Sequence, residues 1–106
     1  MRAVAFAALL LLAAAAPAMA TSGPGCLRVV NVAANDALNL RAKPSANSAI
    51  VGVLPPQTHG IIHLDGKCVP AKVSWGNRWC PVTVYDGNNT TKGWVKARFV
   101  RDSDCP

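Results

Sequence analysis

The chain has 106 residues, and its 11 Lys and Arg against five Asp and no Glu leave a formal net charge of +6. A chain of this length forms one small domain, which excludes a two-domain enzyme. Apolar residues are unevenly spread, because they make up 18 of the first 20 positions. This first segment therefore has to be interpreted separately from the rest.

Residues 1–20 have the layout of a secretory signal peptide. One cation, Arg2, precedes an apolar run that ends in an A-x-A cleavage site at Ala20. The run is too short for a membrane span and is broken by Pro17. We therefore expect a secreted or periplasmic protein with no membrane span, whose mature domain covers residues 21–106.

Lipidation at Cys26 is the alternative that would anchor the protein. A lipoprotein signal sets its cysteine directly behind the apolar run, whereas Gly23-Pro24-Gly25 precede Cys26 and the run ends well upstream. We therefore expect a protein without a lipid anchor.

The four cysteines predict a disulfide framework, because export delivers the chain to an oxidising compartment. Three pairings are possible. We favour Cys68–Cys80, whose intervening segment contains Gly, Pro and Ser and must double back, and Cys26–Cys105, whose partners stand at the two ends of the domain. A zinc site is not expected, because the sequence contains no C-x-x-C.

Apolar and polar residues alternate with a period of two beyond residue 26, and turn residues punctuate the pattern. This predicts an all-β fold of five or six short antiparallel strands in a small barrel or sandwich. In the run at residues 92–95 we expect Val95 to face the core together with Phe99, and Trp94 to face outward. The alternating runs cover residues 27–32, 37–41, 49–54, 60–64, 79–85, 92–95 and 99–100.

The order and spacing of several short motifs resemble the bacterial Src-homology-3-like (SH3-like) domain over residues 27–101. The resemblance implies a small, partly open barrel found outside the cytoplasm that binds peptidoglycan or peptides. The motifs are Leu38-Asn39-Leu40-Arg41-Ala42-Lys43-Pro44-Ser45, Ile50-Val51-Gly52-Val53-Leu54-Pro55, Trp79 with Val82, Gly93-Trp94-Val95, and Phe99-Val100.

Similarity to the eukaryotic SH3 domains, in residues 93–99 and at the position of the groove tryptophan, implies a ligand groove. Proline-rich ligands need aromatic walls, but Lys96 and Arg98 replace the expected Pro and Asn. We therefore expect a cationic groove with Trp and Phe walls, in which Trp94 is either a ligand platform or a cover for a neighbouring side chain. The implied groove residues are Trp79, Trp94, Lys96, Arg98 and Phe99.

No catalytic set or metal site is expected. The five Asp are scattered in turns and in the tail. His59 and His63 would lie about 13 Å apart on a strand, too far to share one metal ion. We expect a non-enzyme without a cofactor.

The excess of Lys and Arg favours anionic partners, and because export separates the chain from nucleic acid, no nucleic acid partner is expected. The leading hypothesis is a monomeric binding module for peptidoglycan or a cell-envelope protein. The alternative is a secreted inhibitor or structural accessory protein that inserts the loop between Cys68 and Cys80, with Lys72, Trp75 and Arg78, into a partner.

The exported protein is expected to lack residues 1–20 and to contain no free thiol. Intact mass spectrometry should give the mass of a chain that begins at Thr21. Reduction should raise this mass by four hydrogens, because each of the two disulfides takes up two. Alkylation of the unreduced protein by iodoacetamide would contradict this prediction.

Overall fold

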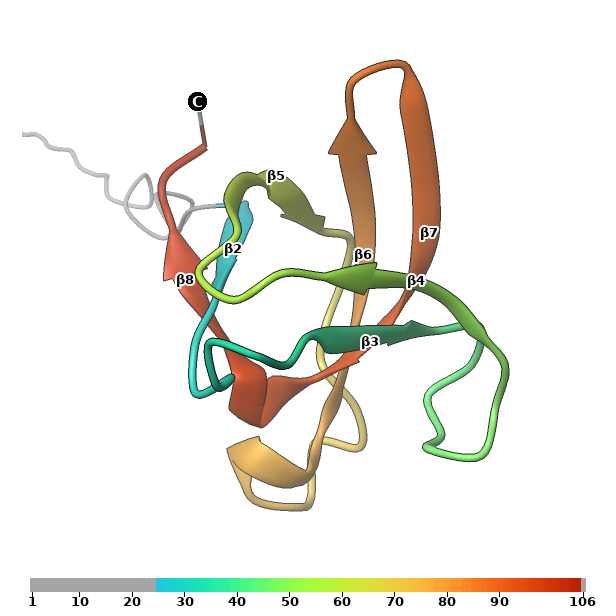
Figure 1. Cartoon of the computed structure of the whole chain (residues 1–106). Helices are drawn as coiled ribbons and strands as arrows, with labels where there is room; N and C mark the ends of the chain where they lie inside the picture. Colours follow the sequence, from blue (N-terminus) through green and yellow to red (C-terminus); the bar gives the residue numbers. More distant parts are fainter. Residues whose placement is uncertain (1–24, 106) are drawn as a thin grey trace, which may run out of the picture.

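The structure, a computed structural model, describes residues 25–105 (Figure 1). Over this range the chain forms seven strands: β2 (Cys26–Val29), β3 (Leu38–Arg41), β4 (Ile50–Leu54), β5 (His59–Leu64), β6 (Trp79–Asp86), β7 (Asn89–Lys96) and β8 (Val100–Ser103). Two single-turn 3-10 helices, η3 (Trp75–Asn77) and η4 (Ala97–Phe99), precede β6 and β8. The all-β prediction is confirmed.

The strand count is higher than the predicted five or six. The runs expected at residues 37–41 and 49–54 form two strands, β3 and β4, of one hairpin whose loop is residues 42–49. The η4 turn separates β7 from β8, which runs beyond the predicted residues 99–100.

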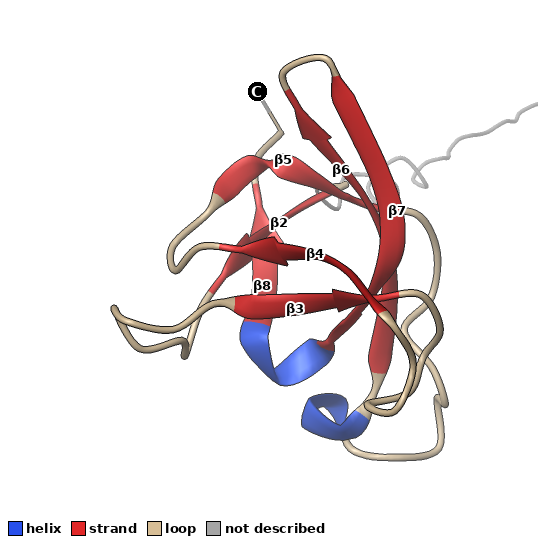
Figure 2. Ribbon diagram, turned by 45° about the vertical axis from the view of Figure 1, so that its right-hand side comes forward, coloured by secondary structure: helices blue, strands red, loops and turns tan. Residues whose placement is uncertain are grey.

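The strands form one open antiparallel sheet in the order β4-β3-β7-β6-β5-β2-β8. The sheet is strongly curled, and the β3–β4 hairpin runs across β6 and β7 at a steep angle (Figures 1 and 2). Curling brings the inner faces of distant strands together over one core.

Period-two alternation places the apolar residues on the inner face. In β2 the side chains of Leu27 and Val29 are buried and Arg28 is exposed. Val95 is fully buried, and Phe99 packs against the core from a partly buried position. The buried core consists of Leu27, Val29, Leu38, Leu40, Leu54, Ile62, Cys68, Cys80, Val82, Val84, Val95, Ala97 and Val100.

The β6–β7 hairpin is longer than the sequence predicted, because its turn is tighter. Asp86 pairs with Asn89, which leaves only Gly87 and Asn88 in the loop. Gly87 has φ +63°, a conformation that glycine adopts without strain. The Asn89-Thr90-Thr91 segment, expected to be part of the turn, therefore belongs to β7.

β3 meets β7 in an unusually close contact at Gly93. A Cβ atom placed on Gly93 would lie 2.7 Å from the Arg41 carbonyl oxygen and 2.7 Å from Leu40 Cγ. The neighbouring residues Arg41 and Trp94 are paired across the two strands. Only a residue without a side chain lets β3 cross β7 at this distance.

Both predicted disulfides are confirmed. Cys26 is bonded to Cys105 and Cys68 to Cys80, and the described residues contain no free cysteine. The bond at Cys26 also leaves no thiol there for a lipid anchor. Two disulfides are compatible with an extracytoplasmic protein.

Two expectations about the membrane concern different parts of the chain. Among residues 25–105 no helix has the length and apolar character needed to cross a bilayer. The expected signal peptide, residues 1–20, lies outside the described residues.

A polar cluster joins β5, β6 and β7 on the outer face of the sheet. The buried Thr83 donates a 2.6 Å hydrogen bond to Asp65 and accepts one of 2.9 Å from Lys92 Nζ. His63 Nδ1 lies 3.2 Å from the other carboxylate oxygen of Asp65. Partial burial raises the pKa of Asp65, but the hydrogen bonds from Thr83 and His63 and the charge of Lys92 outweigh it, so the pKa lies below 3.8.

Gly93→Ala is expected to lower the free energy of unfolding by about 2 kcal/mol or more, because the added methyl group overpacks a contact that includes rigid backbone. Urea unfolding of both proteins measures the change. Gly66→Ala is the control, because its nearest neighbour would be Pro81 Cγ at 3.7 Å, an ordinary contact. Equal losses in the two variants would show that the crossing at Gly93 is not specially tight.

Asp65→Asn should remove a pH-dependent part of the stability. Because the folded-state pKa of Asp65 is depressed, its contribution is present above about pH 4 and is lost as the pH falls through the folded-state value. We expect Asp65→Asn to be less stable than the wild type at pH 7, by about 1 kcal/mol or less, as for other exposed ion pairs.

The difference should narrow toward pH 2 in urea unfolding. The exposed Asp86, substituted by Asn, serves as the control. A difference between wild type and Asp65→Asn that is the same at pH 2 and pH 7 would contradict this assignment.

Candidate functional site

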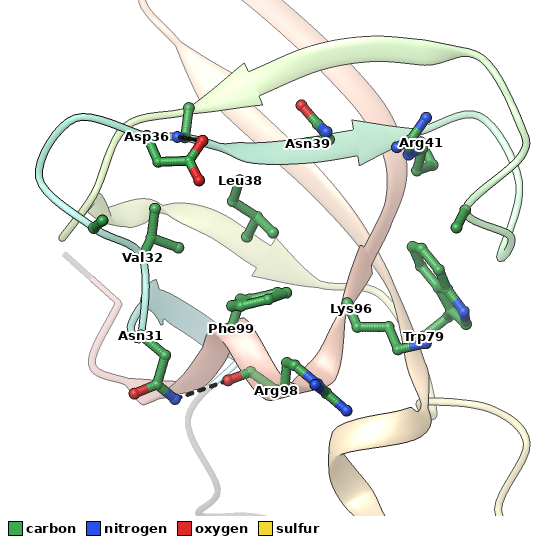
Figure 3. A pocket seen from close by; sticks show the side chains of 13 residues that line it. Asn31, Val32, Asp36, Leu38, Asn39, Arg41, Trp79, Lys96, Arg98 and Phe99 are labelled. Atoms are coloured by element: carbon green, nitrogen blue, oxygen red, sulfur yellow. Dashed lines mark hydrogen bonds between the residues drawn. The ribbon is translucent and has the colours of Figure 1, made fainter.

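A groove of about 670 Å³ opens between β3, the start of β6 and η4 (Figure 3). One wall, called the N-terminal wall below, is the segment that connects β2 to β3. The C-terminal wall is formed by η4 and the end of β7. The residues that line the groove are Asn31, Val32, Ala33, Asp36, Ala37, Leu38, Asn39, Arg41, Ala46, Trp79, Lys96, Arg98 and Phe99.

Trp79 is held at the start of β6 by covalent and backbone contacts. Its N–H donates to the carbonyl of Val69 at 2.7 Å, and the N–H of Val69 donates back to the carbonyl of Trp79 at 2.8 Å. The neighbouring Cys80 is fully buried and bonded to Cys68. Trp79, which resembles the groove tryptophan of SH3 domains, is therefore held in place by its own backbone hydrogen bonds and by the disulfide of the next residue.

Lys96 lies over the ring of Trp79, with Nζ 4.8 Å from the ring centroid. The two residues are paired across β6 and β7, so their side chains share the outer face. This is a cation–π contact, which keeps the ammonium group at the mouth of the groove. One face of the Trp79 ring is consequently covered by Lys96, and a ligand there would meet the lysine together with the indole.

Two arginines lie at the other borders of the groove, and each donates hydrogen bonds to uncharged oxygen atoms. Arg41 donates to the carbonyl of Ser48 at 3.0 Å. Arg98 donates to the carbonyl of Gly76 and to Asn77 Oδ1, each at 3.2 Å. These bonds restrict each guanidinium group but leave its charge uncompensated.

The segment after β2 is attached to η4. Asn31 has φ 58°, in the left-handed region that Asn tolerates, and its side-chain amide donates to the Arg98 carbonyl at 3.0 Å. The N–H of Val30 donates to the Phe99 carbonyl at 2.8 Å. Together these bonds bring the two walls of the groove into a single rigid unit.

The electrostatic balance of the groove is positive. Within residues 25–105, the ion pairs at 4.0 Å or less are those of Asp65 with His63 and Lys92, away from the groove. Asp36 is the acidic residue of the lining, and its carboxylate accepts a 2.7 Å hydrogen bond from the Ala37 N–H. The cations at positions 41, 96 and 98 can therefore attract an anionic group.

Four of the five residues expected in the groove line it, and Trp94 does not. Trp94 is partly buried on the outer face of β7, opposite Pro81 on one side and Arg41 on the other. The outward direction predicted for it is correct, but it lies beside the groove, where it covers neighbouring strands.

The loop between Cys68 and Cys80 holds the three residues of the alternative site in different ways. Lys72 is exposed, and Trp75 is 39% exposed. Arg78 instead turns back into the loop and donates to the carbonyls of Ala71 and Val73, both at 2.9 Å. Arg78 therefore contributes to the shape of the loop.

The groove lining contains residues that the sequence reasoning did not place there, above all Asn31 and Asp36 of the N-terminal wall and Leu38 of β3. The Asn35-Asp36 dipeptide signals a turn, but no local pattern shows that this turn lies against η4. Among the described residues no group of three His, Cys, Asp or Glu side chains is arranged to hold a metal ion.

Comparison with known proteins gives no match to a family model, to a characterised protein or to a solved structure. The resemblance to the bacterial SH3-like domain therefore stays a prediction from the sequence.

Proposed function

We propose that this chain is an extracytoplasmic binding module of the SH3-like kind, and that its groove binds an anionic group of the cell envelope. The observation that carries this proposal is the set of three groove cations, Arg41, Lys96 and Arg98, which have no carboxylate partner in the part of the chain that the structure describes. Three unpaired cations around one groove create a local positive potential, which favours an anionic ligand.

Peptidoglycan is the ligand class that fits the lining best. Its peptide stems carry carboxylates, which the groove cations attract, and its sugar rings present apolar faces to aromatic side chains. Trp79 and Phe99 supply such surfaces beside Lys96. An acidic segment of an envelope protein offers the same charge and is the second form of this ligand.

A location outside the cytoplasm is part of the same proposal. The predicted signal peptide would export the chain, and the two disulfides are compatible with an oxidising compartment. We infer that the module binds and does not catalyse: Asp36 is the one carboxylate of the lining and accepts the Ala37 N–H, and the lining contains no second carboxylate or histidine to act with it as acid and base.

Lys96→Met should weaken binding to purified peptidoglycan sacculi about tenfold, a loss of about 1.4 kcal/mol. Methionine keeps the apolar contact with Trp79 but removes the charge. Co-sedimentation at low salt measures the affinity, and wild-type binding should fall as salt screens the groove.

Lys72→Met is the matched control, because it removes the same charge from the exposed loop. Loss of binding in Lys72→Met but not in Lys96→Met would transfer the site to the loop of the alternative hypothesis. Absence of wild-type binding to sacculi would exclude peptidoglycan and leave the acidic protein segment as the ligand.

A further inference from the structure

The two outer strands of the sheet, β4 and β8, have very different edges. β8 carries Arg101 and Asp102, both exposed, and charges of this kind discourage pairing with another chain. β4 has the sequence Ile-Val-Gly-Val-Leu and no charge. Its unpaired edge therefore lacks the protection that the opposite edge has.

β4 also exposes an apolar surface. Ile50, Val51 and Val53 are 51%, 42% and 58% exposed, whereas Leu54 is buried. A Cβ atom at Gly52 would lie 3.4 Å from Leu40 Cδ2, so this position faces inward. The edge strand thus combines free backbone groups with three exposed branched side chains, which favour β-pairing.

Space is available along this edge. A cleft of about 620 Å³ lies between β4 and the β6–β7 hairpin, which projects past β4 (Figure 1). Leu54, Ile61 and Val84 supply apolar walls, Asn88 and Thr90 of the hairpin supply polar ones, and Asp86 is the one charged residue of the lining. An added strand would therefore meet both apolar and hydrogen-bonding groups.

Charge identifies the occupant. The chain carries a net charge of +6, so two copies repel each other over most of their surface, yet residues 44–58 contain no charged residue. The groove, by contrast, carries three positive charges, on Arg41, Lys96 and Arg98. The neutral β4 segment is the surface through which two copies can approach without like-charge repulsion.

The residues of β4 also suit pairing with themselves. In an antiparallel pair with a twofold axis at Gly52, Val51 of each copy lies opposite Val53 of the other, and Ile50 opposite Leu54. Cross-strand pairs of branched side chains stabilise such a ladder. This is an isologous contact, the commonest form of dimer.

We propose that β4 is a dimerisation edge, at which a second copy of this chain adds its own β4 antiparallel to the first and joins the two sheets into one. The dimer differs from the monomer expected from the sequence. The grooves remain open, because β4 does not line them.

Analytical ultracentrifugation of the disulfide-bonded protein tests this from about 1 µM to about 1 mM. We expect a reversible wild-type dimer and at least a tenfold weaker association in Val53→Lys, because each copy would then place a lysine opposite Val51 of the other, and the two new charges would be diagonal neighbours on one face of the ladder. Trp75→Lys is the matched control: it places the same charge at a 39% exposed position on η3, which does not line the cleft beside β4, and its association should equal that of the wild type.

Val51→Lys provides a second variant should Val53→Lys lose its fold, which thermal melting would reveal. Hydrogen exchange should also show that β4 amides become protected as the wild-type concentration rises. A wild type that is monomeric up to about 1 mM, protection that appears on β8 instead, or a Val53→Lys dimer as tight as the wild type would each overturn the proposal.

Discussion

The crossing of β3 over β7 at Gly93 is the contact on which the rest of the structure depends. It turns an open antiparallel sheet back on itself, so that Leu38 and Leu40 reach the same core as Val95. Alternation along β3 then sends Asn39 and Arg41 to the opposite face, toward the groove. A single position without a side chain thus sets both the enclosed core and the position of one groove wall.

The sequence predicts those parts of the fold that follow from local patterns. Burial of one strand face is a period-two property, so the strands and the inward direction of Val95 could be predicted from alternation. The two disulfides followed from the positions of the cysteines in the chain. The residue at which β7 begins could not be predicted in this way, because it depends on the length of the preceding turn. That turn has only two residues in its loop, and Gly87 adopts a positive φ there.

The two walls of the groove differ in the same way, because one could be predicted from local sequence and the other could not. The C-terminal wall, with Lys96, Arg98 and Phe99, comes from one continuous segment and could be predicted from a resemblance. The N-terminal wall is brought to it by the hydrogen bond of Asn31 to Arg98, 67 residues away in the chain. Contacts over such separations depend on the whole fold, and no motif in a single sequence carries them.

The bond between Cys26 and Cys105 has a mechanical consequence. It joins the two ends of the described domain across 79 residues, and the paired strands β2 and β8 lie next to it. Tension applied at these two cysteines would pass through the covalent bridge and bypass the sheet. The intervening strands, and the groove built on them, would then keep their shape under load.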